Sequence, residues 1–174
     1  VDQNVNLDDV NDAYNRLDFM SSKTIINPGI IMSGTGNNVS AVGQRNYTGT
    51  SGRNEVTVIN NGTIKQTGQN VIGIVTDYGN ITNTGLISST GDNSIGIYGA
   101  NGTISKNTGK IEIGNTGIGI YGGNLLTASA PGYGDQKIEI ENDSEIKSAG
   151  TTGGIGIYAD NTALALGNST VKLG

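Results

Sequence analysis

The chain has 174 residues, of which 29 are glycine, 34% are hydrophobic and 5% are aromatic, and its formal net charge is −5. Cysteine and histidine are both absent, which excludes disulfides, thiolate metal sites and histidine-based catalysis. Ten lysine and arginine residues spread over the chain also argue against a basic surface for nucleic acid or anionic membranes.

The first 22 residues do not follow the repeat that fills the rest of the chain. Val10, Tyr14 and Leu17 recur at the spacing of one helix face, and Asn6 or Asp8 is placed to cap a short helix there. The first coil of a solenoid exposes an apolar end that another segment must cover. Residues 1–22 are therefore predicted to form a helical or irregular N-terminal cap.

From residue 23 to residue 174 a unit of about 23 residues recurs. One mark of the unit is an Ile-Gly-Ile phrase followed by tyrosine or valine, and another is Asn-x-Gly-x-Ile or a close variant. The first mark is centred on Gly73, Gly96, Gly119 and Gly156, and the second begins at Asn27, Asn60, Asn83 and Asn107. Short β-branched segments between glycine and asparagine turns leave no room for helices. The repeat predicts an all-β fold, a parallel β-helix of about five coils with three strands in each coil.

Three columns of aliphatic residues are predicted to point into the coils, because polar neighbours alternate with them along each strand. The first column is Ala41, Ile74, Ile97, Ile120 and Ile157; the second is Ile25, Val58, Ile81, Ile104, Ile140 and Leu164; the third is Ile31, Ile64, Ile87, Ile111, Ile146 and Val171. A ladder of stacked side-chain amides, hydrogen-bonded along the axis, is predicted at Asn27, Asn60, Asn83, Asn107 and Asn142.

Two insertions interrupt the repeat at one corner of the coil. The step from the first column to the second is seven residues in ordinary coils, but 17 from Ala41 to Val58 and 20 from Ile120 to Ile140. Side loops are therefore predicted at residues 43–54 and 122–136, and insertions on one face of a repeat protein are often its binding face. Their candidate binding residues are Arg45, Tyr47, Arg53, Leu125, Leu126 and Tyr133. The alternative is loop variation without function, which costs little stability.

A row of tyrosines is the second candidate binding feature. If Ile95 and Ile97 point inward, Gly96 and Tyr98 lie on the outer face, and Tyr121 and Tyr158 join the same column. Such a row is suited to stacking against sugar rings or to contact with an aromatic-rich protein partner. The alternative is that stacked tyrosines only stabilise adjacent coils.

The repeated Gly-Ile-Gly-Ile-Tyr and Asn-Thr-Gly-x-Ile phrases resemble the passenger regions of autotransporter adhesins of the fusobacterial type, over roughly residues 24–174. The resemblance implies a right-handed parallel β-helix, exported through a C-terminal outer-membrane barrel that this chain lacks and displayed on the bacterial cell surface. It implies coaggregation or attachment to host cells, through a protein or glycan on the partner cell. No segment resembling the N-terminal cap follows the last strand, so the rest of the passenger is expected to stack on the C-terminal end.

Enzymatic chemistry is not expected. The acidic residues fall in turns, as at Asp77, Asp92 and Asp143, or on outward strand positions. Asp135, Glu139 and Glu141 could gather near the second insertion, but Lys137 among them favours a solvated charge pattern. No catalytic residue, metal site or cofactor is predicted. A structural spacer in a large exoprotein and, less favoured, a carbohydrate-active enzyme are the alternatives to an adhesin.

Overall fold

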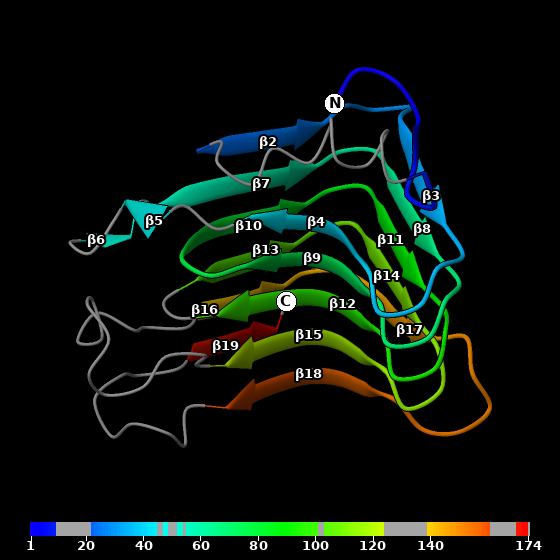
Figure 1. The fold of residues 1–174 in the computed structure, drawn as a ribbon. Helices are drawn as coiled ribbons and strands as arrows, with labels where there is room; N and C mark the ends of the chain where they lie inside the picture. Colours follow the sequence, from blue (N-terminus) through cyan, green and yellow to red (C-terminus); the bar gives the residue numbers. More distant parts are fainter. Residues whose placement is uncertain are drawn as a thin grey trace.

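The computed structural model describes residues 1–9, 22–44, 47–48, 52–53, 55–100, 103–123, 139–160 and 170–173. These residues form a parallel β-helix, in which the chain passes in turn through three sheets that run the length of the stack (Figure 1). No helix occurs within the described ranges. The predicted fold, a parallel β-helix with three strands in each coil, is therefore confirmed.

The three sheets are named A, B and C. Sheet A contains β1 (Val5–Asn6), β3 (Ile31–Gly34), β8 (Thr63–Gln66), β11 (Leu86–Ser89), β14 (Lys110–Ile113) and β17 (Ile146–Ser148). Sheet B contains β2 (Lys23–Ile26), β7 (Val56–Asn60), β10 (Gly79–Asn83), β13 (Ile104–Asn107), β16 (Glu139–Asn142) and β19 (Thr170–Leu173). Sheet C contains β4 (Ser40–Gln44), β9 (Ile72–Thr76), β12 (Ile95–Ala100), β15 (Ile118–Gly123) and β18 (Ile155–Asp160).

Each coil crosses sheets B, A and C in that order. The described strands make five complete coils, from β2–β3–β4 to β16–β17–β18, with β1 added to sheet A and β19 added to sheet B. Every strand pair within the three sheets is parallel, so each residue lies beside the equivalent residue of the next coil. Because of this stacking, one side-chain type recurs along the axis at each position of the coil.

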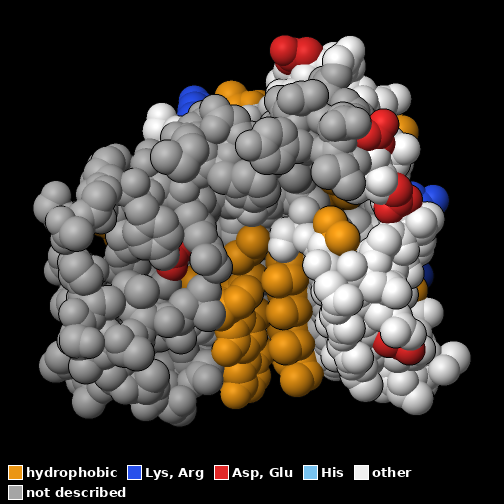
Figure 2. Space-filling view, in the orientation of Figure 1, with side chains coloured by type: hydrophobic (Ala, Val, Ile, Leu, Met, Phe, Trp, Pro, Cys, Tyr) orange, Lys and Arg blue, Asp and Glu red, His pale blue; other side chains and the backbone are white. Residues whose placement is uncertain are grey.

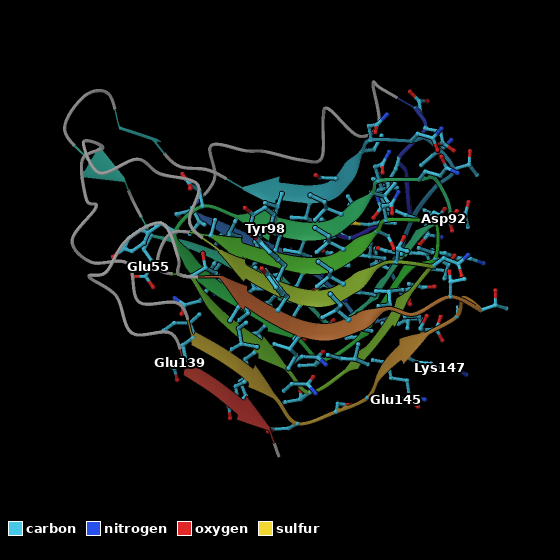
Figure 3. The ribbon with its side chains drawn as sticks, turned by 90° about the horizontal axis from the view of Figure 1, so that it is seen from below. Glu55, Asp92, Tyr98, Glu139, Glu145 and Lys147 are labelled. Carbon is cyan, nitrogen blue, oxygen red and sulfur yellow. The ribbon has the colours of Figure 1, made fainter. Side chains whose placement is uncertain are left out.

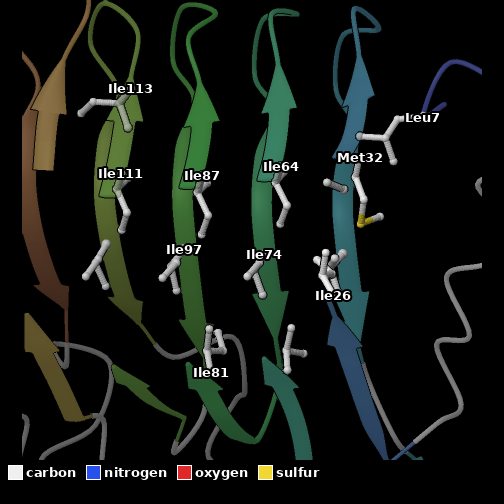
Figure 4. Packing of buried hydrophobic residues seen from close by; sticks show 14 of the residues in the cluster. Leu7, Ile26, Met32, Ile64, Ile74, Ile81, Ile87, Ile97, Ile111 and Ile113 are labelled. Carbon is white, nitrogen blue, oxygen red and sulfur yellow. The ribbon is translucent and has the colours of Figure 1, made fainter. Parts of the chain in front are cut away.

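Inward aliphatic residues of successive coils lie directly on one another and form the core. Ile64, Ile87 and Ile111 are in register in sheet A, and Ile74 and Ile97 are in register in sheet C (Figure 4). All five are fully buried. The register extends to Ile120 and Ile157 in sheet C and to Ile146 in sheet A. These parts of the first and third predicted columns are confirmed.

The second predicted column is wrong at Ile104. Ser105, not Ile104, pairs with Ile81 and Ile140, and it is buried, whereas Ile104 is 42% exposed. Ile97 and Ser105 are eight residues apart, but Ile74 and Ile81 are seven apart. One extra residue in the connection turns every following side chain of the strand to the opposite face.

The first coil also departs from the predicted register. Met32, not Ile31, pairs with Ile64, and Ile26 rather than Ile25 is the buried residue opposite Asn60. The connection from Ile26 to Met32 spans six positions, against four from Asn60 to Ile64. Because of these two extra residues, Ile25 and Ile31 each lie one residue from the predicted register, in opposite directions.

The first and third predicted columns each differ from the structure at a terminal residue. Ala41 is buried as expected, but Val42 is the residue that pairs with Ile74. Val171 pairs with Ile140 in sheet B, so it belongs to the second column and not to the third. Leu164 lies outside the described residues.

The amide ladder is confirmed for four of its five members. The Nδ2 group of each asparagine donates to the Oδ1 atom of the next one, at 2.7 Å for Asn60 to Asn83, Asn83 to Asn107 and Asn107 to Asn142. The first three are fully buried. Asn27 is instead exposed and donates to the Asp2 carboxylate at 2.6 Å. It lies outside the ladder because of the longer connection in the first coil.

Residues 1–9 add to the β-helix rather than lying outside it. β1 pairs with β3, and Val5 and Leu7 are buried in the core (Figure 4 labels Leu7). The helix predicted between Asp8 and Met20 falls almost entirely on residues 10–21, which are outside the described part of the chain. The first nine residues thus lengthen sheet A by one strand at the N-terminal end.

The Asp8 carboxylate, two residues after β1, fixes the turn that follows β3. Asp8 accepts hydrogen bonds from the backbone amides of Thr35 and Gly36 at 2.8 Å and from the Thr35 hydroxyl at 2.9 Å. The two backbone hydrogen bonds, and then the hydroxyl, lower the pKa of Asp8 below its usual range, because they stabilise the charged form.

We expect this attachment to weaken in acid. A carboxyl whose pKa is depressed in the folded state contributes stability above its unfolded pKa, about 4, and that stability is lost as the pH falls through the lower folded pKa. Hydrogen exchange of the Thr35 and Gly36 amides should therefore accelerate below about pH 4 relative to that of Ile87. Asp8→Ala, which removes the acceptor of both hydrogen bonds, should expose both amides to exchange at neutral pH. Equal protection in the two proteins at neutral pH would contradict this role for Asp8.

Candidate binding face on sheet C

The Ile-Gly-Ile-Tyr phrase places its residues differently from the simple alternation expected of a strand. Gly96 and Ile97 are both buried, while Ile95 and Tyr98 are each partly exposed. A Cβ atom on Gly96 would lie 2.6 Å from Cγ2 of Ile111, so this side of the glycine faces the core. The prediction that Gly96 lies on the outer face with Ile95 inside is therefore wrong.

The cause is close packing between sheets C and A. Gly73 repeats the arrangement one coil earlier, with Cγ2 of Ile87 at 2.6 Å from the position of its missing Cβ. Since the methyl groups of sheet A occupy this space, two successive residues of β9, β12 and β15 turn inward. The residues before and after them, three apart in sequence, are left on the outer side.

Two apolar columns result on the outer face of sheet C, here called the sheet C face. In-register pairing aligns one column at Ile72, Ile95, Ile118 and Ile155, and the other at Val75, Tyr98, Tyr121 and Tyr158. Figure 2 shows two parallel hydrophobic columns running down the front of the molecule, where Figure 1 places this sheet. Exposure is greatest in the last coil, at 47% for Ile155 and 43% for Tyr158.

The tyrosine rings contact one another along the axis. Tyr98 and Tyr121 meet edge to face with their centroids 4.6 Å apart, and Tyr121 and Tyr158 are stacked at 5.3 Å with an interplanar angle of 10°. One face of the Tyr121 ring is therefore stacked on Tyr158. The three tyrosines form the predicted column on the outer side of the sheet, in register along the axis.

The outer faces of the other two sheets are mainly polar by contrast, although Ile31 on sheet A and Ile104 on sheet B are exposed. Sheet A carries the in-register row Ser33, Lys65, Ser88, Glu112 and Lys147. Sheet B carries a salt bridge of 3.3 Å between Lys106 and Glu141. Seen along the stack, the labelled charged side chains lie around the outside of the coils (Figure 3). From β9 to β18, the two aligned columns of sheet C hold no charged residue.

The predicted side loops are only partly described. Residues 47–48 and 52–53 form the antiparallel strands β5 (Tyr47–Thr48) and β6 (Gly52–Arg53), which project to the left of the coils in Figure 1. Arg45, Leu125, Leu126 and Tyr133 lie outside the described residues. Both insertions connect a sheet C strand to a sheet B strand, β4 to β7 and β15 to β16, so the prediction of one shared corner is confirmed.

The acidic side chains take the turn and strand positions expected of them. Asp92 accepts a hydrogen bond of 3.0 Å from the Asn115 amide in the next coil, and Glu141 pairs with Lys106. Asp135 and Lys137 are outside the described ranges. Among the residues that are described, no three histidine, cysteine, aspartate or glutamate side chains gather as metal ligands would.

No protein-family model matches the chain, and neither does any curated protein or any solved structure. In the described residues, no helix has the length and apolar composition to span a membrane. The geometry of the sheet C face is therefore the main observation that bears on function.

Sequence reasoning found the tyrosines of this face but missed its isoleucine column. Strict alternation with Ile97 predicts that Ile95, a member of this column, lies in the interior. The available signal was the invariant glycine between two isoleucines. A glycine that recurs at one strand position from coil to coil indicates close contact on its side of the strand, as Gly73, Gly96 and Gly119 show.

Proposed function

We propose that this chain is part of an adhesin of the autotransporter type, displayed on a bacterial cell surface, and that it attaches to a protein on a partner cell through the sheet C face. The observation that carries the proposal is the contrast between the sheets. Eight in-register positions on sheet C are aliphatic or aromatic, while the outer rows of sheets A and B are mainly polar or charged, with isolated apolar residues such as Ile31 and Ile104. Contiguous apolar patches on a folded chain typically mark interaction sites.

A protein partner fits this face better than a glycan does. Sugars stack on the open faces of aromatic rings, but one face of Tyr121 is already stacked on Tyr158, at a centroid distance of 5.3 Å. Isoleucine side chains and tyrosine edges with hydroxyl groups are suited to the apolar core of a protein interface. The face carries no charge, so a partner of either sign can approach it.

The coiled architecture suits surface display. A β-helix has contacts only between neighbouring coils, and the buried amide ladder joins these coils along the axis. The result is a stiff rod that holds its side faces away from the cell. The β5–β6 hairpin and the second insertion remain proposed contributors to binding, and deletion of residues 122–135 would test the second.

The alternative function is a structural spacer whose adhesive part lies elsewhere. The contacts between Tyr98, Tyr121 and Tyr158 favour it, because they stabilise neighbouring coils without any ligand. A spacer has no need of the partly exposed isoleucine column, and this difference allows the two functions to be separated.

The test is attachment of the purified, fluorescently labelled chain to host epithelial cells and to partner bacteria. Ile155→Ser with Tyr158→Ser should weaken attachment at least tenfold, because exposed apolar anchors dominate interface energies. Ile104→Ser is the matched control, since Ile104 is exposed to a similar degree on sheet B. Protease treatment of the cells should abolish binding, whereas glycosidase treatment should not. Attachment that is unaffected by the sheet C variants would leave the spacer as the better account.

A further inference from the structure

A hollow of about 470 Å³ opens on the outer side of sheet A, at the N-terminal end of the stack. Its lining includes the side chains of Asn6, Ile31, Ser33, Lys65 and Thr67, with Asp8 at one edge. The sheet C face takes no part in it. Its volume falls within the range of small-ligand pockets, about 300–1,000 Å³.

The parallel register brings the lining residues together. Asn6, Ser33 and Lys65 are consecutive members of one outward row across β1, β3 and β8. Ile31 lies two residues before Ser33 on the same face and is 44% exposed, which gives the hollow an apolar wall. Thr67 lies two residues after Lys65 and adds a hydroxyl at the opposite side.

The two charged groups of the hollow, Asp8 and Lys65, differ in the hydrogen bonds that they can still make to a ligand. Asp8 already accepts hydrogen bonds from both amides and the hydroxyl of the Thr35–Gly36 turn. Lys65 is exposed, and its ammonium group has no carboxylate partner within the described part of the chain. Three ammonium N–H donors are therefore available beside the hydroxyl groups of Ser33 and Thr67.

A ligand complementary to this set has a carboxylate for Lys65, hydroxyls for Ser33 and Thr67, and one apolar face for Ile31. A sugar ring that bears a carboxylate combines all three within the available volume. A neutral sugar leaves the Lys65 ammonium without a charged partner, and a simple carboxylate makes no use of Ser33, Thr67 or Ile31.

We propose that this hollow binds an acidic sugar, a single pyranose unit bearing a carboxylate, with Lys65 as the group that selects the charge. This site goes beyond the proposed protein attachment through sheet C. It lies on a different sheet and takes a different class of ligand.

The experiment is a titration of the purified chain with glucuronate, glucose and acetate, followed by amide chemical shifts of β3 and β8. Glucuronate should bind saturably, and at least tenfold more tightly than either glucose or acetate, because a charge-assisted hydrogen bond is about twice as strong as a neutral one. The affected amides should cluster around Ser33 and Lys65.

Two variants make the assignment specific. Lys65→Gln should lower glucuronate affinity about tenfold, to the level of glucose, whereas Lys147→Gln, in the same outward row three coils further on, should change nothing. Ile31→Ser should weaken glucuronate binding, and it should not make the hollow prefer acetate to glucuronate. Equal effects of the two lysine variants, or equal binding of glucuronate and acetate, would overturn the proposal. Attachment through sheet C would be untouched by either result, so the two proposals fail separately.

Discussion

Replacing Gly91 with alanine is expected to destabilise the β-helix by about 4 kcal/mol or more, among the largest effects of a single substitution. A Cβ atom at this position would lie 1.7 Å from the carbonyl oxygen of Gly68 and 2.4 Å from its carbonyl carbon. The obstacle is backbone of the preceding coil, which cannot rotate away as a side chain can. Relief would require neighbouring coils to separate, and the core contacts of sheets A and C would be lost with them.

The contact belongs to a column of glycines, so the same result is expected elsewhere along it. A Cβ atom on Gly68 would lie 2.0 Å from the carbonyl oxygen of Gly36, and one on Gly114 would lie 2.2 Å from the carbonyl oxygen of Gly91. None of these glycines has a positive φ angle, so the requirement comes from close approach of the coils and not from backbone conformation. Urea unfolding followed by circular dichroism measures the loss.

Gly153→Ala is the matched control. No atom lies within 4 Å of the position that its Cβ would take, so the urea midpoint should move little or should rise slightly as the unfolded chain loses freedom. If Gly91→Ala and Gly153→Ala unfold at the same urea concentration, close coil-to-coil approach is not what the glycine column provides.

The repeat period made the architecture predictable from the sequence. Because side chains of one column must match from coil to coil, the spacing of Ile74, Ile97 and Ile120 was sufficient to identify stacked strands and their shared interior. The Asn60–Asn83–Asn107 ladder was predictable for the same reason, since an amide can both donate to and accept from an identical neighbour. The periodic features of the fold were therefore predictable from the sequence alone.

Register within a coil was not predictable where a connection changed length. Ile104 matches the repeat in residue type, yet one extra residue before it places Ser105 in the core.

The isoleucine column of the sheet C face was not predicted, for a different reason. Whether Ile95 points in or out depends on the space left by Ile111 of another sheet, and a sequence pattern within one strand contains no information about that distance. Contacts between sheets A and C decide on which face of the strand Ile95 lies.

Replacing Asn83 with leucine is expected to cost about 4 kcal/mol, because it breaks the amide ladder in the middle. Asn83 is fully buried, accepts from Asn60 at 2.7 Å and donates to Asn107 at 2.7 Å. Leucine leaves a donor of Asn60 and an acceptor of Asn107 without partners, and each unsatisfied buried group costs about 1–3 kcal/mol. Asn61→Ala is the control in the adjacent turn, where one partly exposed hydrogen bond from Thr84 is lost and less than about 1 kcal/mol is expected.

Asn83→Asp separates the hydrogen-bond explanation from one of shape, because aspartate has nearly the same volume as asparagine. The introduced carboxylate can still accept from Asn60, but toward Asn107 Oδ1 it presents an acceptor to an acceptor unless it is protonated.

Burial and this contact favour the neutral acid, so its pKa in the folded state is expected to rise above the unfolded value of about 4. The stability that the acid contributes is then fully present below about pH 4 and is lost as the pH rises through the higher folded pKa. The difference in urea midpoint between Asn83→Asp and Asn83→Leu should therefore shift in favour of the acid as the pH falls from 7 to 4. A difference that stays constant over this range would mean that the ladder stabilises the coils through the shape of its side chains and not through its hydrogen bonds.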